Sequence, residues 1–172
     1  MERKILKAIS TIDYLDIDEL NSFNIGVEVQ DFSEPNLSNE DVERIINRYK
    51  EKFNGFNNIR ALHGPFLDLK PSSPDKKIRE ISYFRYRYTL KAAKELDIDY
   101  LIFHSQINPH LNHPSLIKIN NSQATEFWIK LLEEIPDYKG TILLENIFED
   151  SPYMLKELIK TINLPNIRIN LD

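Results

Sequence analysis

The chain has 172 residues, 41% hydrophobic and 28% charged, which suits one domain with a buried core and leaves no apolar run near the roughly 18–20 residues of a membrane span. The formal net charge of −5 argues against nucleic acid as a partner, although a locally basic groove would escape such a count. The absence of cysteine excludes disulfides and thiolate metal sites and fits a reducing cytoplasm, and no signal-peptide pattern follows the polar start.

The first half of the chain predicts three strands separated by helices. In order, these are a strand, a weak helix, a strand, a helix and a strand, over residues 5–12, 14–20, 25–32, 38–55 and 59–63. The second strand is the clearest, because Val27 and Val29 alternate with polar residues at a period of two. Ser38, with Asp41 three residues later, is typical of a capping box at a helix start.

The second half continues the alternation. It predicts a helix, a strand, a long loop, a helix, a strand, a helix and a last strand, over residues 73–96, 100–104, 105–121, 122–135, 141–146, 151–162 and 167–172. Ser73 and Pro74 suit the N-cap and first position of the long helix. The buried stripe expected on that helix is Ile78, Ile81, Phe84, Tyr88, Ala92 and Leu96. A loop as long as 105–121 would be either functional or mobile.

Six alternating strands and helices indicate a parallel α/β sheet, either doubly wound or closed as a barrel. Only four glycines are present, and no glycine-rich phosphate loop follows any predicted strand. The usual doubly wound nucleotide-binding fold therefore loses its main support. We expect a parallel (β/α) barrel of the TIM type.

Four of the predicted strands end on a side chain that can bind a metal, namely His63, His104, Glu145 and Asp172. In a β/α barrel these strand ends lie side by side on the rim that carries the chemistry. Two imidazoles and two carboxylates suit a divalent ion such as Zn, Mn, Fe or Co. Alone, a strand-end histidine is more often a hydrogen-bonded structural residue than a ligand, and a buried carboxylate is as often a paired structural acid as a site residue. Four at one edge favour a site.

Other polar residues are open to two interpretations. His110 and His113 have the spacing of a helical metal-binding pair, but the adjacent Pro109 and Pro114 argue against a helix there. Glu28 is expected to point into the barrel, where it would contact substrate or support a metal ligand. An ion pair with Arg or Lys inside the barrel is the structural alternative for Glu28.

Several short segments, in this order along the chain, resemble landmarks of the xylose isomerase-like β/α barrels. They are His63-Gly64-Pro65-Phe66, Ser73-Pro74-Asp75 with Arg79, Leu96 to His104, Leu144-Glu145-Asn146 and Asn170-Leu171-Asp172. That superfamily contains sugar isomerases and epimerases together with abasic-site nucleases of the endonuclease IV type. The resemblance is specific as an ordered set and runs from about the second strand to the last residue. It implies one domain over residues 1–172.

The resemblance also implies roles for individual residues. Glu145 and Asp172 would be metal ligands, with Glu145 also serving as the proton-transfer base. His63 and His104 match positions that bind metal in the nuclease branch and more often line the substrate pocket in the isomerase branch. Asn146, beside Glu145, would contact substrate.

The function implied is a metal-dependent isomerase or epimerase acting on a small sugar or sugar phosphate, using Mn, Zn or Co to stabilise an enediolate. A zinc phosphodiesterase acting on abasic DNA is one alternative, and a non-catalytic binding or regulatory barrel is another.

The chain departs from the family pattern because that barrel has eight strands, and residue 172 falls at the end of the sixth. We expect a domain truncated after strand six, a fragment of a longer product with little or no turnover of its own. A partner that closes the sheet, or loss of catalysis, would also explain the departure. Open edges at the first and last strands invite self-association.

Overall fold

A computed structural model describes residues 4–108, 110, 113–149 and 151–171. Its strands form one sheet in the order β1-β2-β3-β4-β5-β6, and every neighbouring pair is parallel. The strands are β1 (Leu6–Ile9), β2 (Gly26–Val29), β3 (Arg60–His63), β4 (Tyr100–His104), β5 (Thr141–Glu145) and β6 (Ile167–Asn170). A doubly wound sheet reverses its strand order at a switch point. This sheet does not, which confirms the barrel-type fold.

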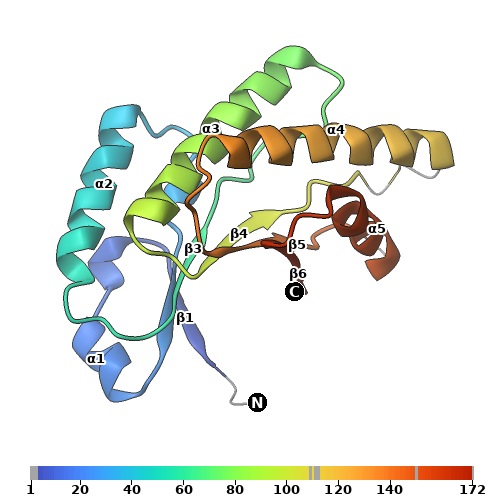
Figure 1. Ribbon diagram of the computed structural model, residues 1–172. Helices are drawn as coiled ribbons and strands as arrows, with labels where there is room; N and C mark the ends of the chain where they lie inside the picture. Colours follow the sequence, from blue (N-terminus) through green and yellow to red (C-terminus); the bar gives the residue numbers. More distant parts are fainter. Residues whose placement is uncertain (1–3, 109, 111–112, 150, 172) are drawn as a thin grey trace.

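Helices connect the strands and lie along one face of the curved sheet (Figure 1). They are α1 (Ile17–Ser22), α2 (Asn39–Lys52), α3 (Lys76–Glu95), α4 (Pro114–Glu133) and α5 (Pro152–Ile162), with 3-10 turns η1 (Ile12–Tyr14) and η2 (Asp31–Ser33). The capping box predicted at the start of α2 is confirmed, because Ser38 and Asp41 bond reciprocally. Among the described residues, no helix combines the length and apolarity needed to cross a membrane.

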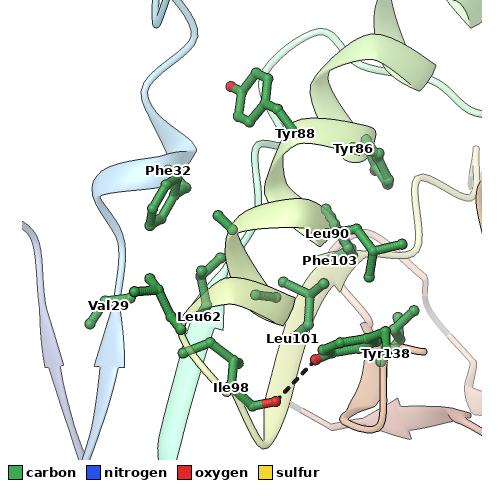
Figure 2. Packing of buried hydrophobic residues seen from close by; sticks show 14 of the residues in the cluster. Val29, Phe32, Leu62, Tyr86, Tyr88, Leu90, Ile98, Leu101, Phe103 and Tyr138 are labelled. Atoms are coloured by element: carbon green, nitrogen blue, oxygen red, sulfur yellow. Dashed lines mark hydrogen bonds between the residues drawn. The ribbon is translucent and has the colours of Figure 1, made fainter. Parts of the chain in front are cut away.

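The core lies between the sheet and these helices. Alternate strand residues face the helices and are fully buried, including Leu62, Leu101, Phe103, Ile142 and Leu144. Tyr86 of α3 stacks on Phe103, with ring centroids 4.2 Å apart and ring planes 6° from parallel. Figure 2 shows this layer, in which the Tyr138 hydroxyl also donates to the Ile98 carbonyl over 3.3 Å. Burial of this apolar surface supplies most of the free energy that favours folding.

The stripe predicted to be buried on α3 is wrong in its first half. Ile78, Ile81 and Phe84 are about two-fifths exposed, whereas Tyr86 and Leu90 face the sheet. The core face also carries Ser82 and Thr89, whose hydroxyls donate to backbone carbonyls one turn earlier in the helix. Because those hydroxyls are satisfied locally, polar residues occupy a buried face that hydropathy assigns to solvent.

The start of α3 also differs from the prediction. Its N-cap is Asp75, whose carboxylate accepts the backbone N–H groups of Lys77 and Ile78. Ser73 and Pro74 precede the helix, and the Ser73 carbonyl accepts a hydrogen bond from Arg79. A carboxylate that accepts two of the unpaired N–H groups of the first turn is a better cap than a hydroxyl placed two residues too early.

The predicted loop 105–121 is shorter than expected, because α4 begins at Pro114. His113 is its N-cap and its side chain accepts the backbone N–H of Ser115. Asn120 and Asn121, which the prediction placed in that loop, lie within the helix and are buried. Asn120 accepts the Ser72 hydroxyl at 2.6 Å and donates to Asn121 at 3.3 Å. This buried polar network ties the loop after β3 to α4.

Candidate metal centre

Three of the predicted site residues are the last residues of neighbouring strands. His63 ends β3, His104 ends β4 and Glu145 ends β5, and His104 lies opposite Glu145 in the parallel register. Their chain neighbours point into the helix-covered core. Because side chains alternate along a strand, the three residues project from the opposite, inner face of the sheet. The structure therefore brings them together as expected of the carboxyl-end rim of a barrel.

The ligand atoms of the three residues all lie within 4.8 Å of one another. His63 Nε2 is 3.7 Å and His104 Nε2 is 3.6 Å from Glu145 Oε2. Two ligand atoms held about 2.0–2.2 Å from one tetrahedral zinc ion are separated by roughly 3.3–3.6 Å, close to the two histidine–glutamate separations. The side chains of His63, His104 and Glu145 are only 10%, 15% and 13% exposed, respectively. This set of two imidazoles and a carboxylate could hold a divalent metal ion.

A backbone contact fixes the tautomer of His63. Its Nδ1 lies 2.8 Å from the carbonyl oxygen of Gly64, in a buried position. A carbonyl can only accept, so Nδ1 carries a hydrogen and donates it, which leaves Nε2 on the side of Glu145. Metal-binding histidines commonly use their second nitrogen in this way.

Gly64 allows the close approach of backbone that this contact requires. A Cβ built on Gly64 would clash with the ring of Phe103, far inside any acceptable contact. Phe103 is itself fixed in the stack with Tyr86, so the ring has no room to yield. A side chain at position 64 would therefore displace the Phe103 ring or the backbone that His63 Nδ1 contacts.

Asn170 is a site residue that the sequence did not assign. It lies opposite Glu145 in the pairing of β5 with β6, and its Nδ2 donates to Glu145 Oε1 at 2.6 Å. That bond occupies one carboxylate oxygen and leaves Oε2 facing the imidazoles. The signal was present in β6, where Ile167 and Ile169 alternate with polar residues, so Asn170 should share a face with Glu145.

Phe66 is a second residue not assigned from the sequence. Its ring lies 4.4 Å from the ring of His104, centroid to centroid, at an interplanar angle of 26°. It also meets His63 edge to face, at 5.4 Å and 77°. Phe66 belongs to the His-Gly-Pro-Phe segment that suggested the family, but nothing in that segment says that its ring would cover both imidazoles.

The loops that follow β4 and β5 are tied together beside the cluster. The Glu149 carboxylate accepts the backbone N–H groups of Ile147 and Phe148 and the hydroxyl of Ser105. The N–H of Ser105 in turn donates to the Glu145 carbonyl at 2.9 Å. The end of β5 is thus held by the loop after β4 as well as by pairing with the neighbouring strands.

The remaining candidates stand apart from this cluster or outside the described residues. Asp172, predicted as a ligand, lies outside them. Glu28 accepts a hydrogen bond from Gln30 at 3.1 Å on the inner face of β2. Asn146 follows the end of β5. His113 caps α4 and His110 is exposed in the preceding turn, and neither belongs to the cluster. The substrate roles of Glu28 and Asn146 stay predictions.

Comparison with known proteins gives one related sequence and several similar structures. The uncharacterized protein MJ1311 of Methanocaldococcus jannaschii is 30% identical over 123 residues, which cover 65% of this chain and 40% of MJ1311. The TTHB071 protein from Thermus thermophilus, in a crystal soaked with ZnCl2, superposes with a TM-score of 0.75 at 22% identity, covering 98% of this chain and 65% of TTHB071. A D-tagatose 3-epimerase-like protein superposes with a TM-score of 0.71 at 20% identity, covering 99% of this chain and 65% of that protein.

The chain thus spans less than two thirds of the length of each of these proteins. The profile of one family, described as xylose isomerase-like TIM barrel, matches residues 20–172, which include every strand from β2 to β6. The strand order and the polar residues at the strand ends agree with that match. The chain belongs to the xylose isomerase-like TIM barrel family.

Proposed function

We propose that the barrel to which this chain belongs is a divalent metal-dependent isomerase or epimerase of a small sugar or sugar phosphate. The observation that carries the proposal is the convergence of His63, His104 and Glu145 on one point of the inner rim. The similar structures include a D-psicose 3-epimerase in the presence of D-fructose and an L-ribulose 3-epimerase. Those likenesses are 16% and 15% identical and support the fold, so the chemistry rests on the cluster.

A divalent ion held at this point would polarise a substrate carbonyl and acidify the adjacent C–H bond. Glu145 supplies the negative charge of the cluster. Its Oε1 accepts the Asn170 amide and its Oε2 faces both imidazoles, so both oxygens are occupied. This arrangement favours holding the ion over moving a proton. We assign Glu145 first as a ligand, and as the proton-transfer base only with rearrangement of the Asn170 contact.

The other assignments complete the proposal. Asp172 would add a second carboxylate ligand, and Glu28 and Asn146 would contact the hydroxyl groups of the sugar. Glu28 is well placed for this role because it lies on the inner face of β2, where its strand partner towards β3 is the small Ala61. Glu28 itself is only partly buried, so its carboxylate stays accessible from the inner face.

A second candidate function is phosphodiester hydrolysis at abasic sites in DNA with zinc. Two imidazole nitrogens and one carboxylate are a donor set that suits zinc. The net charge of −5 opposes binding to a polyanion and places this candidate second.

Ketose binding tests the first proposal without requiring turnover. The protein loaded with Mn²⁺ would be mixed with D-fructose, D-tagatose or D-psicose, and ketose proton relaxation would be followed by NMR. We expect the bound paramagnetic ion to broaden ketose signals in the native protein. Glu145→Gln should abolish the effect by releasing the ion. Glu157→Gln, on the exposed surface of α5, is the matched control and should behave as the native protein.

Two results would contradict the proposal. Cleavage of an abasic-site oligonucleotide by the zinc-loaded protein, without any ketose broadening, would favour the phosphodiesterase. Retained metal with neither ketose broadening nor DNA cleavage would favour a non-catalytic binding barrel.

A further inference from the structure

The aromatic contacts of Phe66 go beyond packing, because both partners are the imidazoles of the candidate metal centre. The Phe66 ring lies face on to His104 and meets His63 edge to face. The two imidazoles are themselves 5.1 Å apart and nearly perpendicular, at 89°. The three rings form one aromatic unit, in which Phe66 limits rotation of the His104 ring about its Cβ–Cγ bond.

A contact from the next loop holds Phe66 in this position. Gln106 Nε2, in the loop after β4, donates to the Phe66 carbonyl at 3.0 Å. Gln106 has a φ of +56°, a left-handed conformation that costs energy for a residue other than glycine. That conformation directs its side chain back to the loop after β3. The loops of β3 and β4 are therefore joined directly beside the two imidazoles.

Ring orientation matters at a metal site because only one direction of each Nε2 lone pair meets the ion. His63 is oriented by its Nδ1 bond to the Gly64 carbonyl. One face of His104 is covered by Phe66, at a centroid distance of 4.4 Å. A flat aromatic ring can restrain rotation of an imidazole without competing for the metal, since it offers no ligand atom.

We propose that Phe66, held by Gln106, is a positioning residue that presets the orientation of the two imidazoles for a divalent ion. The inference rests on the metal site of the proposed function, but not on the substrate. Groups that orient metal ligands typically affect metal affinity by roughly 10–100-fold. Loss of the Phe66 ring should therefore weaken metal binding without removing any ligand.

The test combines zinc affinity with a spectroscopic signature that needs no metal. The chain has four histidines, and His110→Gln with His113→Gln would leave only the two of interest in the NMR spectrum. In the metal-free protein, the ring current of Phe66 should shift the His104 ring protons upfield. Phe66→Leu should remove that shift and lower the affinity for Zn²⁺ roughly tenfold, measured by competition with a chelator.

Three further variants give the test its controls. Phe66→Tyr keeps a six-membered aromatic ring and should restore both the shift and the affinity. Gln106→Gly keeps the left-handed backbone but removes the amide, and should give an intermediate loss of affinity of roughly threefold to tenfold. Leu67→Ala changes the adjacent exposed residue and should leave both readouts unchanged.

The results separate this inference from the proposed function. Zinc affinity of Phe66→Leu within twofold of the native value, or absence of the upfield shift in the native protein, would overturn the positioning role. Failure of the native protein to bind Zn²⁺ would overturn it together with the metal site. Tight zinc binding that depends on Phe66, with no response to any ketose, would uphold this inference while removing the sugar substrate.

Discussion

The two faces of strands β3, β4 and β5 differ in function: one packs in the core and the other carries the candidate metal ligands. On the face towards the helices, Leu62, Phe103 and Leu144 are completely buried among apolar neighbours. The next residue along each strand is His63, His104 or Glu145, which faces inward and joins the candidate metal centre. Adjacent residues of one strand thus have different roles: one stabilises the fold and the next can bind a metal ion. Substitutions on one face should change stability with little effect on metal affinity, and those on the other face the reverse.

The largest effect should come from the helix-facing side. Phe103→Ala removes a ring packed between Tyr86 and Trp128. We expect a loss of about 3–5 kcal/mol in the free energy of unfolding, because the cavity cannot close between stacked rings. Urea denaturation of the metal-free protein would measure it.

Phe148→Ala is the control for that substitution. Phe148 is 73% exposed, so its change in stability should stay below about 0.5 kcal/mol. Similar losses for the two variants would show that the stacked rings contribute no more to the free energy of unfolding than an exposed ring does.

Metal should stabilise the fold only through the inner face. At a free Zn²⁺ concentration about 100 times the dissociation constant, linkage predicts about 2.7 kcal/mol of added stability, which removal by EDTA should reverse. His63→Gln should lose that increment while the metal-free stability changes much less. A zinc increment of native size in His63→Gln would break the proposed separation of the two faces.

Two buried tyrosines, Tyr49 and Tyr86, allow a comparison of a hydrogen-bonded hydroxyl with an unpaired one. Both are fully buried, but the Tyr49 hydroxyl donates to Asp31, whereas the Tyr86 hydroxyl has no hydrogen-bond partner among the described residues. Burial and the hydrogen bond to Asp31 raise the pKa of Tyr49, so its hydroxyl stays protonated and donates. Tyr49→Phe should cost about 1.5–3 kcal/mol because Asp31 Oδ2 loses its donor, although Asp31 Oδ1 keeps the N–H of Ile12.

Tyr86→Phe removes an unpaired hydroxyl and should be neutral or stabilising by about 1 kcal/mol, again measured by urea denaturation. Equal and large losses in both variants would mean that the Tyr86 hydroxyl has a partner in solution, such as a buried water molecule.

On the inner face, a smaller effect than the loss of a ligand should come from the support of Glu145. Asn170→Ala removes the amide that donates to Glu145 Oε1 but keeps all three ligand atoms of the cluster. We expect roughly tenfold weaker zinc binding, equivalent to about 1.4 kcal/mol, measured by calorimetry. A loss as severe as that of His63→Gln would mean that Asn170 itself binds the ion.

Strand ends were the part of the molecule most readable from the sequence. His63, His104 and Glu145 each follow an apolar run, and the alternation of strands and helices fixes which ends are neighbours. The role of Asn170 was missed because pairing between strands far apart in sequence decides which side chains meet. That of Phe66 was missed because a loop places it.

Helix faces were less readable than strand ends. The buried side of α3 was misassigned because Ser82 and Thr89 satisfy their hydroxyls within the helix and so lie in the core. The start of α4 was missed because Pro114 was expected to exclude a helix, whereas it lies in the first turn of α4, and because the buried Asn120 meets its partner Ser72 only in the fold. In both cases a local or tertiary hydrogen bond reverses the preference expected from polarity alone.

The strictly consecutive strand order has a consequence for biosynthesis. Each strand pairs with the strands that immediately precede and follow it in the chain, so each new βα unit can dock on the one already made. Such a sheet can grow progressively from its N-terminal end while the ribosome is still translating. The first imidazole would be in place early, but the cluster of His63, His104 and Glu145 would form only after Glu145 has left the exit tunnel. Metal capture would then follow, rather than direct, assembly of the first four strands.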